Sequence, residues 1–343
     1  MKNSFVPGAV AIAVIAVAMC APAFALAEDV TIENLVRAES DTMIRANLTR
    51  YKIGPGELVH ERQTVSAEGP QPVIRPNQDT LYSVVVLDLS EPATVKLPEV
   101  DGRFQSMLVI NQDHYNFAEA SPGTYELTKD EVGSRFAFVL FRTFVNVADG
   151  NDLAAAHAAQ DAITVSGGGD GPFEAPDWDL ETLAKARKAL NDLASAVGFN
   201  ISSAFGRKDE VDPINHLVGA IAGWAGQQAT IATGIVDSVD ANDGDIPYAV
   251  TVNDVPVDAF WSITVYNADG YLEPNELGRN SYNNTSATPN DDGSYTIHFG
   301  SCDDGRVNCI PITPGWNYTI RLYKPRPEIL DGNWTFPEIV KAE

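Results

Sequence analysis

The stretch Arg75-Pro76-Asn77-Gln78-Asp79-Thr80-Leu81-Tyr82-Ser83 places several hydrogen-bonding side chains directly before the apolar run 84–87. The prolines that precede it predict an extended approach of the chain. The run Val84-Val85-Val86-Leu87 is rich in β-branched residues and predicts a strand. The stretch therefore marks the point where the N-terminal segment gives way to β-structure.

Short runs rich in Val, Ile, Phe and Tyr follow, bounded by Gly, Pro and Asp. They predict strands over 82–88, 93–97, 103–111, 124–127, 135–144, 248–252, 259–266, 295–299, 307–312 and 316–323. The run 135–144 is apolar on both of its faces, which predicts a strand covered on both sides. The turn spacing of the last third is typical of an antiparallel β-sandwich, jelly-roll-like in form.

Helical spacing of apolar residues predicts helices over 31–50, 152–163, 179–197 and 214–225. Thr31 or Asp29 is the expected cap of the first helix. A stripe of Leu180, Leu183, Leu190, Leu193 and Val197 is expected to pack inward, and the last helix is expected to be buried. The glycine segment 167–172 is expected to be a flexible interdomain loop. The fold class is α+β and mainly β, with an N-terminal domain over 28–170, a helical linker over 171–228 and a C-terminal β-sandwich over 229–343.

The first 27 residues have the pattern of a secretory signal peptide. An apolar run over 6–18 leads to two Ala-x-Ala sites, which predict cleavage near Ala25 or Ala27. We therefore expect a periplasmic or secreted protein. No later run reaches ~18 uninterrupted apolar residues, so stable membrane insertion is not expected. Cys20 leaves lipidation open, although the bulky Met19 before it disfavours this alternative.

Acidic residues outnumber basic ones by 47 to 23, and the formal net charge is −24. This balance argues against nucleic acid and anionic lipid as partners, because both require a basic surface. The charge is typical of a solubilising coat; an acidic functional surface is the alternative. Cys302 and Cys309 flank an Asp-Asp-Gly turn. In an oxidising compartment they are expected to form a disulfide that closes a hairpin.

Several catalytic and binding motifs do not occur in the sequence. It contains no Gly-x-Ser-x-Gly elbow, no His-Glu-x-x-His, no phosphate-binding loop and no dinucleotide fingerprint. The five histidines are scattered, and the acidic loop 240–245 departs from calcium-binding spacing. We therefore expect no cofactor and no metal site.

Polar residues cluster at two predicted strand ends. Asn77, Asp79, Thr80 and Tyr82 precede or begin the first strand, and the segment 111–115 follows the third. If these strands are antiparallel neighbours, both clusters lie at one rim of the sheet. His114 would then act as acid or base, Asp79 would orient it and Tyr82 would donate a proton or hydrogen bond. The alternative is structural, with Asn and Asp bonded to local backbone.

Further residues are candidates for contacts with a substrate. Asn77, Thr80 and Tyr115 belong to the two clusters above. Arg142 interrupts an apolar strand face and requires an anionic ligand, or a structural pair with Asp79 or Asp88. In the last third, Trp261, Arg279 and Tyr282 suit a sugar ring; the alternative is that Trp261 belongs to the core and Arg279 pins a loop.

Several long motifs together resemble a family of unknown function, DUF1254, with its usual C-terminal companion, DUF1214. The first domain is matched by Arg75–Ser83, Gln112–Tyr115 and Val132–Arg135 with Arg142-Thr143; the second is matched by Phe260–Ser262 with Tyr266, Asp291–Ser294, and Arg321–Pro325 with Glu328–Trp334. The resemblance covers nearly all of the chain after the signal. It implies a mixed α and β first domain, followed by a β-sandwich similar to those of glycan-processing proteins.

The resemblance brings no assigned reaction. It raises the interest of Asn77, Asp79, Tyr82, His114 and Arg279, and it leaves room for a homo-oligomer. Our leading expectation is a polar interdomain pocket that handles a carbohydrate-like or small polar substrate, as a hydrolase or lyase. The alternative is a non-catalytic periplasmic protein that binds a small molecule or glycan, or acts as a scaffold.

Overall fold

The computed structural model describes residues 27–71 and 73–342. The predicted signal peptide and Cys20 lie outside these ranges, apart from Ala27. The described chain is mostly β with few helices, as predicted. Its helices are α1 (Leu35–Tyr51), α2 (Lys129–Val132), α3 (Asp152–Asp161), α4 (Leu180–Val197), α5 (Pro213–Ala222) and α6 (Pro327–Leu330). Two 3-10 turns, η1 (Ile201–Ser203) and η2 (Cys302–Asp304), complete the helical segments of this part of the chain.

The N-terminal domain is built on a five-stranded antiparallel sheet in the order β1-β2-β7-β4-β5. Its strands are β1 (Val59–His60), β2 (Thr80–Asp88), β7 (Phe136–Phe144), β4 (Gln105–Asn111) and β5 (Asn116–Glu119). A second sheet in the order β6-β3-β8 covers one face. It consists of β6 (Gly123–Leu127), β3 (Ala93–Leu97) and β8 (Thr164–Gly167).

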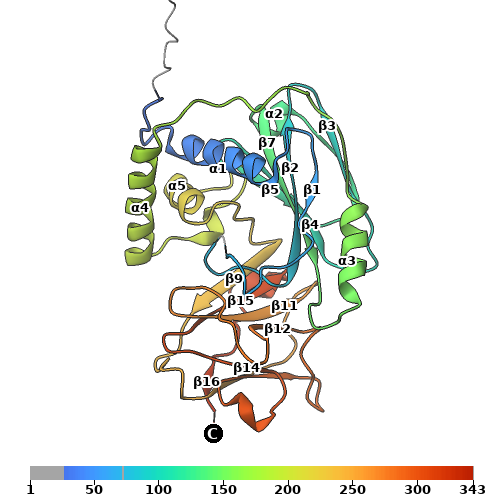
Figure 1. Ribbon diagram of the computed structural model, residues 1–343, viewed down its shortest axis with the longest axis vertical. Helices are drawn as coiled ribbons and strands as arrows, with labels where there is room; N and C mark the ends of the chain where they lie inside the picture. The colour runs from blue at the N-terminus through green and yellow to red at the C-terminus, as the bar shows by residue number, and fades with distance from the viewer. Residues whose placement is uncertain (1–26, 72, 343) are drawn as a thin grey trace, which may run out of the picture.

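The central strand β7 is apolar on both faces because both faces are covered. Val139 and Phe141 pack toward the three-stranded sheet, and Phe138 and Leu140 pack toward the helices. In Figure 1, α1, α4 and α5 lie on one side of this sheet, and α3 lies on the other. The prediction of a doubly covered strand is confirmed.

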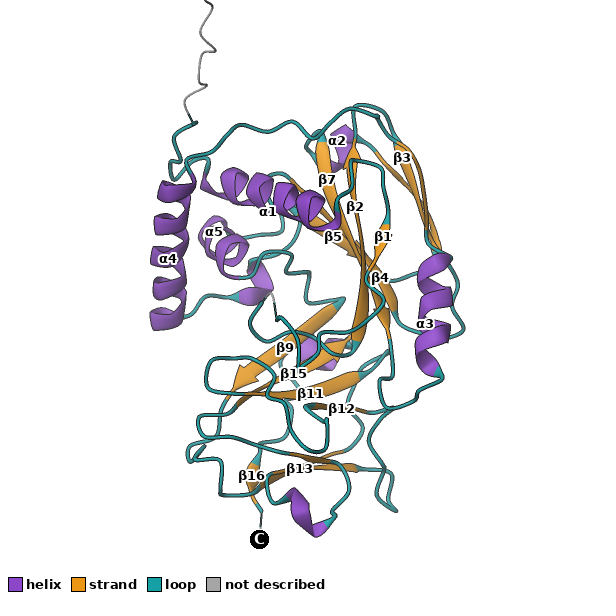
Figure 2. Ribbon diagram, in the orientation of Figure 1, coloured by secondary structure: helices purple, strands orange, loops and turns teal. Residues whose placement is uncertain are grey.

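The C-terminal domain is a β-sandwich of two four-stranded sheets with a shared apolar core (Figure 2). One sheet has the order β12-β11-β15-β9, with β12 (Ser281–Asn283), β11 (Trp261–Tyr266), β15 (Asn317–Tyr323) and β9 (Ala232–Asp237). The other has the order β14-β13-β10-β16, with β14 (Cys309–Ile310), β13 (Tyr295–Phe299), β10 (Tyr248–Val252) and β16 (Val340–Lys341). Alternate residues of β11 point in opposite directions, as the pleat requires. Trp261, Ile263 and Val265 enter the core, while the other face of β11 looks toward the N-terminal domain.

Several local expectations are wrong. Helix α1 begins after Asn34, not after Thr31 or Asp29, and no side-chain cap bond closes it. On α4, Leu183 is buried, but Val197 is 74% exposed, so the predicted stripe is only partly used.

The glycine segment 167–172 is not a free interdomain loop. Gly168 and Gly169 donate backbone hydrogen bonds to the carbonyls of Pro92 and Asp88. A Cβ on Gly169 would lie 2.3 Å from the Ser90 hydroxyl, so the close approach requires glycine.

Cys302 and Cys309 form the predicted disulfide. The expected hairpin is wrong, however, because β14 runs parallel to β13. The chain reverses through η2 and returns before Cys309 joins the sheet edge. Disulfides persist in oxidising compartments, which is consistent with a location outside the cytoplasm. Among residues 27–71 and 73–342, no helix has the length and apolar character needed to cross a membrane.

Candidate functional site

The opening stretch of the sequence joins the two domains. The Arg75 N–H donates to the Gly270 carbonyl at 2.7 Å, and Arg321 donates to the Arg75 carbonyl at 2.8 Å. The Tyr266 hydroxyl donates to the Pro76 carbonyl at 2.8 Å. Backbone groups of the stretch are thus paired with the polar face of the sheet that contains β11 and β15, as buried polar groups require.

Asp79 is the most deeply buried charge of this contact, with 2% of its surface exposed. Its carboxylate accepts hydrogen bonds from the Ser262 hydroxyl at 2.6 Å and from the Asn283 amide at 3.2 Å. Burial raises the pKa of Asp79, while Ser262, the positive charge of Arg321 and Asn283 act in the opposite direction. Its acceptors are therefore used to bind the C-terminal domain.

The expected meeting of Asp79 with His114 at one rim is wrong. Strand β7 lies between β2 and β4, so these two strands run parallel to each other and not antiparallel. Thr80 is level with Phe144, whereas Asn111, just before His114, is level with Ala137. Phe144 and Ala137 are seven positions apart on β7, or roughly 24 Å. The proposed acid–base pair is not formed.

His114 instead anchors the segment after α5. It is fully buried, and its Nε2 accepts a hydrogen bond from the Ala225 N–H at 3.0 Å. Its ring packs against the rings of Phe205, His216 and Trp224. Burial, together with the charge of His216, lowers the pKa of His114 to about 3. The ring is therefore neutral and holds the backbone of Ala225, which has a strained φ of 66°.

Arg142 does not pair with Asp79 or Asp88, contrary to the structural alternative. Asp88 pairs with Arg135 through two hydrogen bonds of 2.9 Å. Arg142 donates to the Gln227 side-chain oxygen at 2.6 Å and to the Ala225 carbonyl at 3.2 Å. The same Ala225 residue therefore contacts His114 through its N–H and Arg142 through its carbonyl.

Arg142 lines a cavity of about 750 Å³ on the helix-covered face of the five-stranded sheet. Val84, Phe138, Leu140 and Trp224 form apolar walls of this cavity. Ala225, after α5, also lines it. The remaining lining residues come from α1, from residues 61–71 and 73–77, and from β2: Met43, Ala46, Asn47, Arg50, Tyr51, Glu61, Arg62, Gln63, Thr64, Val65, Ser66, Gly69, Pro70, Val73, Pro76, Asn77 and Tyr82. This cavity is lined by residues of the N-terminal domain and of the segment after α5, whereas the pocket expected from the sequence was polar and lay between the domains.

Three residues that were predicted to contact a substrate make contacts within the protein. Trp261 is 3% exposed and belongs to the sandwich core, which confirms the structural alternative. Thr80 is fully buried and accepts a hydrogen bond from Asn77 at 3.2 Å. Asn77 borders the cavity, but its amide also donates to the Tyr323 hydroxyl at 2.7 Å.

Arg279 and Tyr282 do come together, in a groove of about 430 Å³ on the C-terminal domain. The guanidinium carbon of Arg279 lies 5.2 Å from the centre of the Tyr282 ring. The backbone N–H of Arg279 donates a hydrogen bond to the side-chain oxygen of Asn275, and the Arg279 carbonyl accepts one from the Asn275 amide. These two bonds fix the loop. This groove shares no lining residue with the large cavity.

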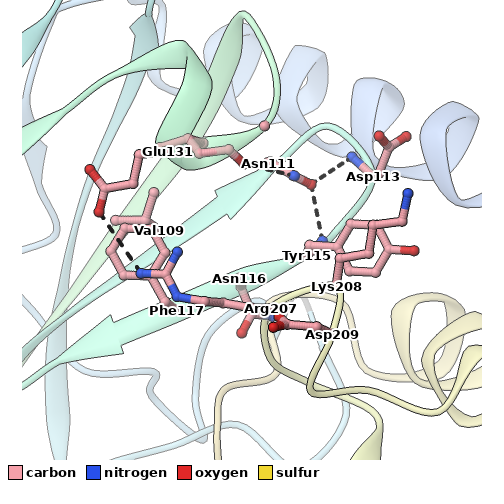
Figure 3. A pocket seen from close by; sticks show the side chains of 12 residues that line it. Val109, Asn111, Asp113, Tyr115, Asn116, Phe117, Glu131, Arg207, Lys208 and Asp209 are labelled. Carbon is pink, nitrogen blue, oxygen red and sulfur yellow. Dashed lines mark hydrogen bonds and ion pairs between the residues drawn. The ribbon is translucent and has the colours of Figure 1, made fainter.

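Tyr115 lines a third cavity of about 300 Å³, shown in Figure 3. One face of its ring stacks on His216 at 4.5 Å. Arg207 lies over the Phe117 ring and approaches Glu131 at 3.9 Å. The side chains of this cavity are largely engaged with one another, so the larger cavity is the better candidate site.

The cavity of about 750 Å³ is also lined by residues that were not singled out from the sequence. Trp224 and Ala225 follow a helix that was predicted only as buried, and Glu61 with Tyr51 lies in segments without a motif. The one feature of the sequence that pointed to this site is Arg142, a single cation on an apolar strand face. Among the described residues, no group of three or more His, Cys, Asp or Glu side chains is placed to hold a metal ion.

Two family models match the chain. "Protein of unknown function (DUF1254)" matches residues 55–167, and "Protein of unknown function (DUF1214)" matches residues 228–327. No curated protein matches the sequence. The models thus cover the five-stranded domain and most of the sandwich, and neither description names an activity.

Two solved structures are similar along most of the chain. The VPA0106 protein from Vibrio parahaemolyticus is 17% identical, with a TM-score of 0.68 over 91% of this chain and 98% of its own. A putative uncharacterized protein from Burkholderia cenocepacia is 14% identical, with a TM-score of 0.49 over 90% of this chain and 87% of its own. The first likeness shows the shared two-domain fold and nothing about function.

Replacing Asp79 with alanine is expected to lower the free energy of unfolding by about 3 kcal/mol, because Ser262 and Asn283 lose a buried acceptor. Denaturant unfolding followed by circular dichroism measures this change. Asp258→Ala is the control, since it removes an exposed carboxylate paired with Arg326 and is expected to cost about 0.5 kcal/mol or less. Equal costs for the two variants would contradict the structural role of Asp79.

Stability is also expected to fall in acid through His114. Its pKa is about 3 in the folded chain, against ~6.5 when unfolded, so the unfolded chain takes up the proton first as pH falls. The stability present above pH ~6.5 is lost progressively toward pH ~3. His114→Gln keeps an acceptor for the Ala225 N–H but does not titrate. Between pH ~7 and ~4, the free energy of unfolding of this variant should fall by about 3 kcal/mol less than that of the wild type. Urea unfolding at a series of pH values tests this prediction. If the free energy of unfolding had the same pH dependence in the variant and the wild type, the prediction would be refuted.

Proposed function

We propose that this protein binds small molecules with an apolar body. The chain belongs to the two-domain family in which a DUF1254 domain is followed by a DUF1214 domain. The observation that supports this proposal is the cavity of about 750 Å³. Its volume lies within the range of ~300–1,000 Å³ that is typical of ligand sites. Apolar walls with a few polar groups are also typical of such sites.

Strands and an aromatic contact form one wall of the cavity. Val84 and Leu140 are opposite each other on β2 and β7, and Phe138 packs edge-on against Trp224 at 5.0 Å. Another wall is formed by the irregular residues 61–71 and 73–77, and Asn77 is hydrogen-bonded to the sandwich. A preformed sheet wall opposite an irregular segment provides both shape and access for a ligand.

Ligand binding is favoured over a hydrolase or lyase activity, because the acid–base pair of His114 and Asp79 that was expected from the sequence is not formed. His114 accepts a hydrogen bond from Ala225, and Asp79 accepts hydrogen bonds from the C-terminal domain. The apolar wall formed by Val84, Phe138, Leu140 and Trp224 fits a molecule with an apolar body, and the polar lining residues fit a polar group on that molecule. The predicted signal peptide and the disulfide support a periplasmic or secreted place of action.

A neutral fluorescent dye, N-phenyl-1-naphthylamine, tests this function. We expect its fluorescence to rise on binding to the wild type. Ala46→Trp should weaken the binding at least ~10-fold, because Ala46 is exposed on α1 and lines the cavity, so that an indole there fills the space.

Ala189→Trp is the matched control for this experiment. Ala189 is exposed on helix α4 and does not line the cavity. This variant should therefore bind the dye as the wild type does. Absence of dye binding, or an equal loss in both variants, would refute the proposal.

A further inference from the structure

Three polar side chains lie at one level across three adjacent strands of the cavity's sheet. Tyr82 on β2 is opposite Arg142 on β7, and Ser106 on β4 is opposite Arg142 from the other side. Directly opposite residues of antiparallel strands point to the same face. The next level on that face is apolar, with Val84 and Leu108 on either side of Leu140.

Arg142 retains donors for a ligand. A guanidinium has five N–H groups, and two hydrogen bonds from Arg142 end on protein acceptors, both of them neutral oxygens. Among the described residues, no carboxylate lies within 4.0 Å of it. A half-buried guanidinium without a counter-charge is costly, and an anionic ligand removes that cost.

Ser106 lies at the same level of the sheet, but it is not among the residues that line the cavity. Its side chain is fully buried, and its hydroxyl has no hydrogen-bond partner among the described residues. Buried hydroxyls are nearly always paired in folded proteins. The Tyr82 ring stands on the other side, 5.8 Å from the Arg142 guanidinium carbon.

The charge of the cavity lining has the opposite sign to that of the protein. The charged lining residues are Arg50, Arg62, Arg142 and Glu61, a formal balance of two positive charges in a chain of net charge −24. Arg50 donates to Glu61 at 2.7 Å, and Arg62 is paired with Asp161. Arg142 is thus the lining arginine that has no carboxylate partner in the described chain. In the part of the chain that the structure describes, the one uncompensated positive charge of the lining is therefore that of Arg142, and it attracts anions.

The apolar wall provides a length for the ligand body to contact. Four residues of β7 separate Arg142 from Phe138, which is about 13 Å along an antiparallel strand. An extended hydrocarbon chain of about ten carbons spans this length, at roughly 1.3 Å per carbon along its axis for single bonds of ~1.5 Å.

We propose that the ligand is a medium-chain carboxylate, whose head group is bound by Arg142 beside Tyr82 and whose chain lies along Leu140 and Phe138. The inference rests on the proposed function, because it assigns the ligand of the same cavity. An Arg–carboxylate pair forms two parallel charge-assisted hydrogen bonds, which sets the direction in which the ligand enters.

Decanoate and 1-decanol distinguish the head group from the chain, since they differ only in the charged terminus. Both are titrated at pH ~8, below the concentration at which decanoate forms micelles, by displacement of the neutral dye. Decanoate should bind the wild type at least ~10-fold more tightly than decanol. Equal affinities would overturn the inference.

Arg142→Met should remove that preference, so that decanoate and decanol bind the variant with affinities within ~2-fold of each other. Arg50→Met is the matched control, because it removes the same charge from the same cavity, where the arginine already has Glu61 as partner. It should keep the preference. An equal loss in both variants would show a general charge effect and overturn the assignment to Arg142.

Arg142→Lys keeps the positive charge but not the paired donors, and should retain only part of the preference. It provides the test if Arg142→Met does not fold, as judged by circular dichroism. Dye binding without any preference for decanoate would overturn this inference and leave the proposed function standing. If neither the dye nor decanoate bound, both proposals would fail.

Discussion

The buried polar face between the two domains is the constraint on which the rest of the structure depends. One face of β11 is apolar and forms the sandwich core, so the other face, with Ser262 and Tyr266, must find polar partners when it is covered. Residues 75–79 supply them, mostly through backbone carbonyls and the carboxylate of Asp79. A sequence that looked like a catalytic loop is therefore the polar contact between the two domains.

This contact also determines the place of the cavity. Asp79 is directly followed by β2, so fixing it against the sandwich fixes the level of Tyr82 in the sheet, and with it that of Arg142 on β7. At the other end of the cavity, His114 holds Ala225, whose carbonyl accepts a hydrogen bond from Arg142. Both histidine and aspartate act by positioning other groups. Asp79 does so through the hydrogen bonds that its carboxylate accepts from Ser262 and Asn283, and His114 through the one that its Nε2 accepts from Ala225.

Predictions from local pattern were accurate where one short segment contained all the information. The strand that corresponds to β11 and the doubly apolar β7 were predicted from single runs. The short β1, β5 and β8 were not, because two to four residues carry too little periodicity. The exposed residues on α4 show the converse: an apolar stripe does not reveal how much of it a neighbour will cover.

The sequence by itself determined the class of the fold, the two-part organisation, the disulfide and the anomalous Arg142, because each depends on composition, spacing or a residue out of pattern. Only the tertiary structure decided the partners of Asp79, His114 and Arg142. The reason is the order of strands: β7 is inserted between β2 and β4 and turns an expected antiparallel pair into parallel strands. A pairing between segments far apart in the chain leaves no local signal, so the separation of Asp79 from His114, and the cavity beside Arg142, appear only when the sheet is assembled.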